Sequence, residues 1–252
     1  MRMLSLLSWT VSLLMLALVA TPATAAEFTD AQKTEMGTVI KDYLLKNPEI
    51  LQQAMAELQR KQAEQQASQA SDSIKQNADV IYRASADQAE GNLKGKVTVV
   101  EFFDYNCPYC KRMLPAMAAL LESDKDVRIV MKEFPILGEG SVYASRAAVA
   151  AVQQGKYWPF HLALLGAQGR VDQARVLTIA KGLGIDTDKL TKDMQSPAIT
   201  TMIETNNALA GKLGINGTPA FVIGDKLYPG AIEADQLKTV VAEARAKGCA
   251  IC

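Results

Sequence analysis

The 252-residue sequence predicts a mixed α/β domain that follows a helical N-terminal segment, and three patterns lead to this prediction. Residues 96–103, KVTVVEFF, and residues 126–134, DVRIVMKEF, are rich in β-branched and aromatic residues, which is typical of buried strands. Residues 107–121 lie between them and carry apolar side chains at helical spacing. A strand–helix–strand unit of this length predicts a right-handed parallel crossover. Residues 27–70 contain almost no glycine and are expected to be helical.

The charge balance and the histidine count narrow the possible functions. The chain has 27 basic and 27 acidic residues, so it gives no indication of a nucleic-acid or anionic-surface partner. It has one histidine, His161, and no dense cluster of carboxylates. A metal site with several histidines and a histidine-based hydrolase are therefore not expected.

Residues 1–25 have the pattern of a signal peptide. Arg2 precedes an apolar stretch at residues 4–20, and Ala23-Thr24-Ala25 forms a small-residue cleavage site. The alternative interpretation is an uncleaved membrane anchor, for which the stretch is short. Cleavage near Ala25 would place the mature protein in the periplasm, an oxidising space in which cysteine pairs form disulfides.

Residues 26–66 predict an N-terminal helical segment, and residues 67–95 a helical linker. Thr29 and Gln32 have the spacing of a capping box, and Asn47-Pro48 signals that a second helix begins. A narrow apolar stripe runs along both helices: Met36, Val39, Ile40, Tyr43, Leu44, Leu51, Met55 and Leu58. The stripe needs a partner surface, which is either the chain's own domain or the same helices of another subunit.

A long helical region is expected after the second strand. Residues 141–213 are expected to form several helices separated by glycine and proline. Residues 215–230 read as two short strands around a Gly224-Asp225 turn. A last helix is expected at residues 234–247, ending at Gly248.

Two cysteines, Cys107 and Cys110, lie where the first strand meets the following helix, in the sequence FFDYNCPYCKR. The N-terminus of a helix stabilises a thiolate, so we expect Cys107 to be an exposed nucleophile with a lowered pKa. Cys110 is expected inside the first turn, where it can resolve a mixed disulfide. A metal site would need further ligands, which the sequence does not place nearby.

Beyond the cysteines, four residues carry a resemblance to a known family. Glu101 lies six residues before Cys107, Pro115 eight residues after it, and Thr218-Pro219 lies within the sequence GTPAF. This pattern over about residues 96–248 resembles the DsbA family of thioredoxin-fold oxidoreductases. The resemblance implies a thioredoxin fold with an inserted helical domain at residues 141–213, preceded by an N-terminal helical oligomerisation segment.

The resemblance also implies roles for individual residues. Cys107 and Cys110 would form the redox disulfide, and Glu101 would accept the proton of Cys110. A cis bond before Pro219 would pack against the cysteines, and Pro108, Tyr109, Thr218 and Pro219 would contact the substrate. No cofactor and no metal ion are implied.

Two features depart from the best-known oxidase of that family. The dipeptide Pro108-Tyr109 stands where that oxidase has Pro-His, which implies a less oxidising site. The N-terminal segment resembles the oligomerisation segment of ScsC-type proteins, including outer-membrane-associated antigens of this group. This implies a homodimer or homotrimer, with association with the outer membrane as a further expectation. Thr218 before the proline is similar to disulfide isomerases.

A second cysteine pair, Cys249 and Cys252, ends the chain. A local disulfide is the leading interpretation, and a second redox pair and a soft-metal site remain as alternatives.

Together these patterns predict a periplasmic oxidoreductase that forms or isomerises disulfides in exported, cysteine-containing proteins. A membrane redox partner would recycle it. The alternative is a soft-metal (copper) binding or chaperone-like surface protein in which the Cys107–Cys110 pair is ancillary.

Overall fold

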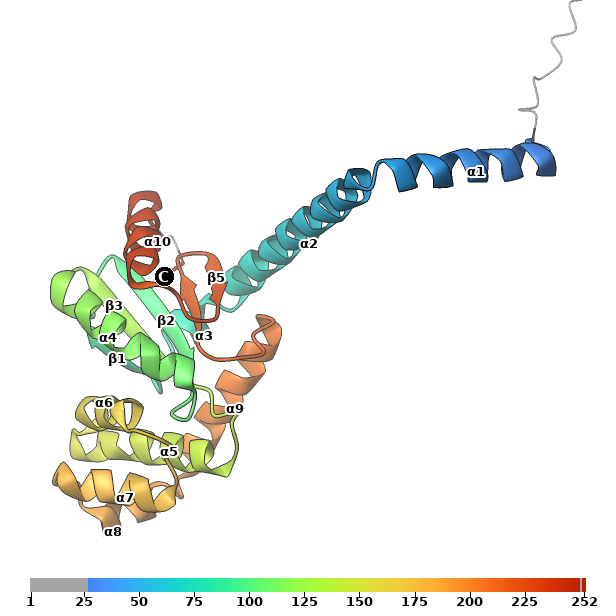
Figure 1. Cartoon of the computed structure of the whole chain (residues 1–252). Coiled ribbons are helices and arrows are strands. Elements are labelled where there is room, and N and C mark those ends of the chain that lie inside the picture. Colours follow the sequence, from blue (N-terminus) through green and yellow to red (C-terminus); the bar gives the residue numbers. More distant parts are fainter. Residues whose placement is uncertain (1–26, 250) are drawn as a thin grey trace, which may run out of the picture. The chain divides into compact units, whose positions relative to one another are not determined.

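The structure is a computed structural model that describes residues 27–249 and 251–252, so the predicted signal peptide lies outside the described residues. The chain divides into two compact units, with the boundary between residues 58 and 59 (Figure 1). The helices are α1 (Asp30–Lys46), α2 (Glu49–Gln76), α3 (Ala78–Tyr82), α4 (Pro108–Ser123), α5 (Glu139–Ala150), the 3-10 helix η1 (Ala151–Gln154), α6 (Tyr157–Gly166), α7 (Gln173–Gly182), α8 (Thr187–Asp193), α9 (Pro197–Lys212) and α10 (Ala234–Lys247). The strands are β1 (Gln88–Gly91), β2 (Val97–Phe103), β3 (Val127–Glu133), β4 (Ala220–Ile223) and β5 (Lys226–Pro229).

The first unit is helical, as predicted. The capping box at the start of α1 is present, because Thr29 Oγ1 accepts from the Gln32 N–H while Gln32 Oε1 accepts from the Thr29 N–H. Helix α1 ends at Lys46 with Asn47 as its C-cap, and α2 begins at Glu49, directly after Pro48. No residue of α1 is buried, and most of its large apolar side chains are exposed.

The second unit is built on a five-stranded sheet with the order β1-β3-β2-β4-β5. Strands β2 and β3 are parallel, with Val97 opposite Val127, which confirms the predicted crossover through α4. The other three pairs are antiparallel. The β4–β5 hairpin turns at residues 224–225, as the sequence predicts.

Alternate residues of β2 pack in two separate hydrophobic cores, one on each face of the sheet. Val97, Val99 and Phe103 pack with α4 and α10 on one face of the sheet. Val100 and Phe102 pack on the other face with α3, the end of α2 and the end of α9. All seven residues of β2 are buried, which is expected for a central strand covered on both faces.

The segment at residues 67–95 is more than the linker that we predicted. Ile74, Ile81 and Tyr82 are buried in the second core, and β1 forms an edge of the sheet beside β3. The sequence QAEG of β1 has no strand signature, and its position is set by hydrogen bonds to β3. Sequence patterns therefore missed the part of this segment that belongs to the domain.

Helices α5 to α9 are inserted between β3 and β4, where the sequence predicts a helical region. They pack mainly against one another, and α6 contacts α4 (Figure 1). This places the inserted helices next to the N-terminal half of α4, which carries the cysteines. None of the helices that the structure describes combines the length and the apolar character that a membrane span requires.

Candidate functional site

The turn between β2 and α4 is held by one buried carboxylate, Asp104. It accepts hydrogen bonds from the backbone N–H groups of Asn106 (2.7 Å), Ile136 (2.8 Å) and Leu137 (2.9 Å), and from Ser141 Oγ (2.7 Å). These donors come from its own turn, the loop after β3 and helix α5. Asp104 therefore fixes the residues before Cys107 relative to the inserted helices, a role that the sequence analysis missed because its partners are distant in sequence.

Cys107 is the N-cap of α4, and Cys110 lies in its first turn, with Pro108 at the first helical position. Both side chains are free thiols, so the structure describes the reduced form of the pair, and the disulfide between them stays a prediction. Our expectation that Cys107 is exposed is wrong, because only 3% of its surface is accessible. The loop before β4 covers it: in its protonated form, Cys107 Sγ donates to the carbonyl oxygen of Thr218 at 3.1 Å, and the Thr218–Pro219 peptide bond is cis.

The two thiols have opposite pKa shifts. A hydrogen bond from the Cys110 thiol lowers the pKa of Cys107 to about 5, against the opposing effect of burial. The Thr218 side chain and the backbone N–H groups of Cys110 and Tyr109 lower this pKa through further hydrogen bonds. Burial raises the pKa of Cys110 well above its ordinary value, helped by its hydrogen bond to Cys107 and by the charge of Glu101. At neutral pH, Cys107 is therefore a thiolate and Cys110 a thiol.

Glu101 lies on the face of β2 that carries Val99 and Phe103, and it is buried beneath α4. Burial, together with the negative charge of Cys107, raises the pKa of Glu101 to about 8. A carboxyl group with this pKa can exchange a proton near neutral pH. The structure thus brings Glu101, Cys107 and Cys110 into one electrostatic cluster, in which the family resemblance had implied a place for Glu101.

The outer side of the site is formed by Pro108 and Tyr109, which are exposed. Tyr109 has 52% of its surface accessible, and the guanidinium of Arg112 lies 4.4 Å from the centre of its ring. Pro219 is buried, whereas Thr218 is half-buried. Pro115 lies inside α4, at the position that the sequence analysis indicated.

A second buried polar cluster lies beside the turn, and sequence reasoning did not find it. Tyr105 and Tyr157 each donate a hydrogen bond to Glu133 Oε1 at 3.1 Å, and the Tyr105 hydroxyl lies 3.0 Å from His161 Nδ1. Burial raises the pKa of Glu133 to about 8 and lowers that of His161 to about 3. His161 is buried within α6, and the cluster joins β3 to α6.

Comparison with known proteins identifies the family. Residues 98–242 match the model of the DSBA-like thioredoxin domain. The chain belongs to this family. Residues 32–65 match a second model, the copper resistance protein ScsC N-terminal domain. The DSBA-like domain covers β2 to α10, and hence all of the residues that the structure gathers around Cys107.

Individual relatives agree with this assignment. A thioredoxin-like oxidoreductase from Silicibacter pomeroyi DSS-3 is 50% identical, with a TM-score of 0.66 over 67% of this chain and 97% of that chain. Proteus mirabilis ScsC in a transitional conformation is 34% identical, with a TM-score of 0.65 over 87% of this chain and 98% of that chain. The Na(+)/H(+) antiporter NhaA 1 of Salinispora arenicola is 30% identical over 160 residues, 63% of this chain, but the chain spans only 24% of that curated relative.

The second cysteine pair lies after the matched region, beyond the end of α10. Cys249 and Cys252 are joined by a disulfide, with the two sulfurs 2.04 Å apart. Ile251 packs on the second core, and Arg83 Nη1 donates to the Ile251 carbonyl at 2.6 Å. Among the residues that the structure describes, no three His, Cys, Asp or Glu side chains are grouped as a metal site would require.

Proposed function

We propose that this DSBA-like protein is an exported thiol–disulfide oxidoreductase that forms or isomerises disulfides in other proteins through Cys107 and Cys110. The observation that carries the proposal is the opposite pKa shift of the two thiols at the start of α4. A purely structural disulfide needs no such difference. An exchange site does, because one cysteine must attack as a thiolate while the other waits as a thiol.

The reaction can be written from these groups. The Cys107 thiolate attacks one sulfur of a client disulfide, and the other client sulfur leaves as a thiolate. Cys110 then transfers its proton to the carboxylate of Glu101 and attacks Cys107 Sγ, which releases the client sulfur. The client gains two electrons and the pair becomes a disulfide. The same steps in reverse pass a disulfide to the client.

The loop at Thr218 supplies a place for the client chain. Thr218 is half-buried beside Cys107, and its backbone can bind an extended peptide while the client cysteine is joined to Cys107. Pro108 and Tyr109 are exposed at the start of α4 and would contact the same peptide. These three residues, with Pro219 beneath them, are the proposed substrate-binding set.

The signal-peptide pattern at residues 1–25 supports an exported protein, and disulfide chemistry suits an oxidising compartment such as the periplasm. In that compartment the protein would act on cysteine-containing exported proteins. A redox partner in the membrane would return the Cys107–Cys110 pair to its working state after each cycle. Association with the outer membrane is a further part of the proposal.

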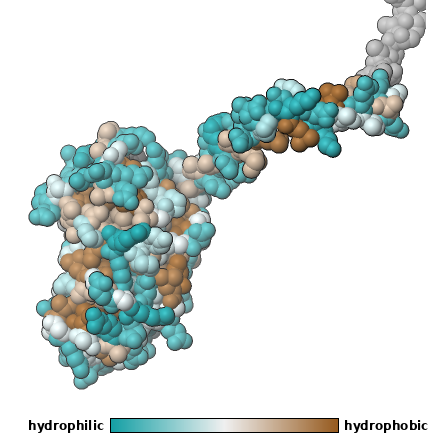
Figure 2. Space-filling model, viewed as in Figure 1, coloured by the Kyte–Doolittle hydropathy of each residue, from teal (hydrophilic) through white to brown (hydrophobic). Residues whose placement is uncertain are grey.

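The N-terminal unit supports a homodimer or homotrimer. Its large apolar side chains are 39% to 70% exposed: Phe28, Met36, Val39, Ile40, Tyr43, Leu45, Leu51, Met55 and Leu58. Figure 2 shows apolar surface gathered along these helices. Apolar patches of this kind mark contact sites. The match of residues 32–65 to the ScsC N-terminal domain supports the same segment as the site of assembly.

Assembly would favour isomerisation over simple oxidation. To isomerise a client, the enzyme must hold it while one mixed disulfide is exchanged for another. Several linked sites raise the effective concentration of thiol around one bound client. Deleting residues 27–66 should therefore leave a folded monomer that exchanges disulfides but isomerises poorly.

The test uses the purified mature protein, its Cys107→Ser variant and the 27–66 deletion. Reduction of insulin should require Cys107, and recovery of a scrambled disulfide protein should require both Cys107 and the N-terminal segment. Sedimentation should give a dimer or trimer for the intact chain. An intact chain without exchange activity that binds Cu(I) tightly would instead favour the alternative, a soft-metal-binding protein, and a monomer at micromolar concentration would overturn the assembly.

A further inference from the structure

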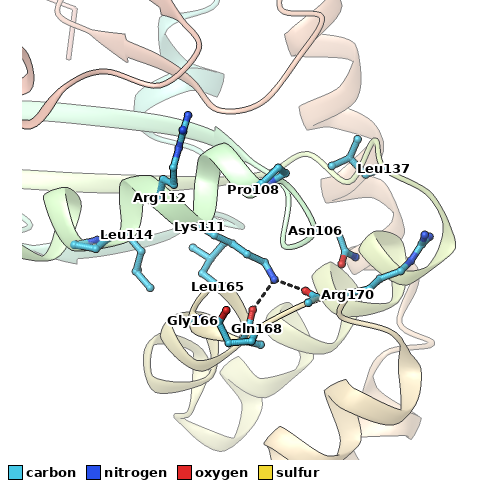
Figure 3. Close-up of a pocket in the computed structure, with 13 residues that line it drawn as sticks. Asn106, Pro108, Lys111, Arg112, Leu114, Leu137, Leu165, Gly166, Gln168 and Arg170 are labelled. Carbon is cyan, nitrogen blue, oxygen red and sulfur yellow. Dashed lines mark hydrogen bonds between the residues drawn. The ribbon is translucent and has the colours of Figure 1, made fainter.

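A cavity of about 710 Å³ opens beside the cysteines, between α4 and the loop that follows α6 (Figure 3). Asn106 and Pro108, the residues on either side of Cys107, both line it. Its apolar lining includes Leu114, Leu137 and Leu165. A chain bound at Cys107 therefore has this cavity directly next to it.

The charges that line the cavity are all positive. They belong to Lys111 and Arg112 on α4 and to Arg170 after α6, and no acidic residue is among the lining residues. Burial lowers the pKa of Lys111, and the positive charge of Arg175 on α7 lowers it further. Asp172, two residues after Arg170, is the N-cap of α7, and its side chain accepts a hydrogen bond from the backbone N–H of Arg175.

These cations have no acidic partner within the described part of the chain. The ion pairs of the domain involve other residues. Lys111 Nζ instead donates to the carbonyl oxygens of Ala167 (2.7 Å) and Gly169 (2.8 Å), drawn as dashed lines in Figure 3. Arg112 lies over the ring of Tyr109. Neither contact neutralises a charge. The carboxylate of Asp104 lies behind the lining residues Asn106 and Leu137, where four donors bind it, so the charged side chains that line the cavity itself are all positive.

We propose that this cavity binds an acidic side chain of the client, close in sequence to the client cysteine that reacts with Cys107. This rests on the proposed exchange function and specifies its substrates. An extended chain advances about 3.3 Å per residue, so an aspartate or glutamate within roughly four residues of the client cysteine can reach the cavity. The leucine lining suits the methylene groups of a glutamate better than an inorganic anion, which would leave the apolar surface uncovered.

The experiment compares three synthetic disulfide peptides that differ at one position near the cysteine, which is Glu, Gln or Lys. The reduced mature protein should react fastest with the Glu peptide and slowest with the Lys peptide, about tenfold apart at low salt. The ratio should fall as salt rises, because exposed charges are screened. In the Arg170→Glu variant, the preference should disappear or reverse.

Two controls make the result specific. Lys226→Glu makes the same change of charge on the exposed strand β5, away from the cavity, and should keep the preference for the Glu peptide. Hydroxyethyl disulfide, which is small and uncharged, measures the exchange chemistry by itself. Failure to react with it would overturn the proposed function. Normal reaction with it, combined with equal rates for the three peptides, would overturn the cavity proposal alone.

A preference for Glu that survives in both Arg170→Glu and Arg170→Gln would also overturn the proposal, because the preference would then come from another surface. Circular dichroism of both variants checks that they are folded.

Discussion

The thiol of Cys107 and the carbonyl oxygen of Thr218 lie 3.1 Å apart, although 111 residues separate them in the chain. The contact joins the start of α4 to the loop before β4. It covers Cys107 in the reduced protein, so that the nucleophile is buried but keeps a lowered pKa. Reactivity here therefore depends on the hydrogen bonds to sulfur more than on exposure, and the first two predictions follow from this.

Cys107 should be the thiol that reacts first. With a pKa of about 5 it is ionised in mildly acidic solution, whereas Cys110 remains protonated. Brief treatment of the reduced protein with iodoacetamide at pH ~6.5 should modify Cys107 almost exclusively, because the thiolate is the reactive form. Peptide mapping by mass spectrometry locates the label, and Cys110→Ser serves as the control that keeps Cys107 reactive. Preferential labelling of Cys110 would reverse the assignment.

The hydrogen bond from Cys110 should be the largest single contribution to the acidity of Cys107. Cys110→Ala removes it and should raise the pKa of Cys107 more than Thr218→Val does, while Cys110→Ser, which keeps a donor, should lie between. The pH dependence of thiolate ultraviolet absorbance measures all three. If Thr218→Val had the larger effect, the loop rather than the helix would control the nucleophile.

Glu101 should make the oxidised protein less stable as pH rises. In the reduced protein, burial and then the charge of Cys107 raise its pKa from 4.5 to about 8. In the oxidised form that charge is absent but burial still raises the pKa, so the favourable contribution of Glu101 is complete below pH 4.5 and is lost as pH rises towards the raised pKa. The oxidised form is used because its cysteines do not titrate. Between these values, Glu101→Gln should reduce the slope of unfolding free energy against pH by up to about 1.4 kcal/mol per pH unit.

The matched control for this measurement is Glu204→Gln. Glu204 is exposed, so its replacement should leave the slope unchanged. Glu133, which is also buried with a raised pKa, remains in both variants and supplies the residual slope. Identical slopes for Glu101→Gln and the unmodified protein would mean that Glu101 ionises in the folded state as easily as in the unfolded one.

The hydroxyl group of Tyr105 should stabilise the fold. It donates a hydrogen bond to Glu133 and lies 3.0 Å from His161 Nδ1, and all three side chains are buried. Among the described residues, Glu133 Oε2 has no hydrogen-bond partner. Tyr105→Phe removes a donor from a buried carboxyl group and should cost about 1–3 kcal/mol of unfolding free energy. Urea denaturation measures this cost. Tyr109→Phe is the control, since its ring is exposed, and an equal cost for both would contradict a special role of the cluster.

Local patterns predicted most of the fold. The capping box at Thr29, the parallel pairing of β2 with β3, the hairpin turn at Gly224 and the last helix follow from short-range signals and are present in the structure. Strand β1 and the buried face of α3 were missed, because their burial is decided by residues that are far away in sequence. Pairing across a sheet can stabilise a segment whose own sequence does not favour a strand.

The candidate site was also predicted only in part, because contacts between distant residues cannot be read from local sequence. Their position at the start of a helix indicated Cys107 and Cys110, and the family resemblance implied Glu101 and Pro219. Local sequence did not indicate Asp104, whose four donors come from three separate segments, or the cluster around Glu133. It also led to the wrong expectation for the exposure of Cys107, since the covering residue is 111 positions away.

The second core has a consequence for the order in which the chain can fold. Ile74 and Ile81, near the start of the domain, are covered by Leu209 and Leu213 and lie over a sheet that needs β4. The hydroxyl of Tyr82 is bonded to the carbonyl of Gly224, 142 residues later. A chain emerging from the ribosome or through a membrane pore cannot close this core until about residue 224 has appeared, because most of the contacts span long loops. The domain therefore forms as one late cooperative event, after nearly all of it has been delivered.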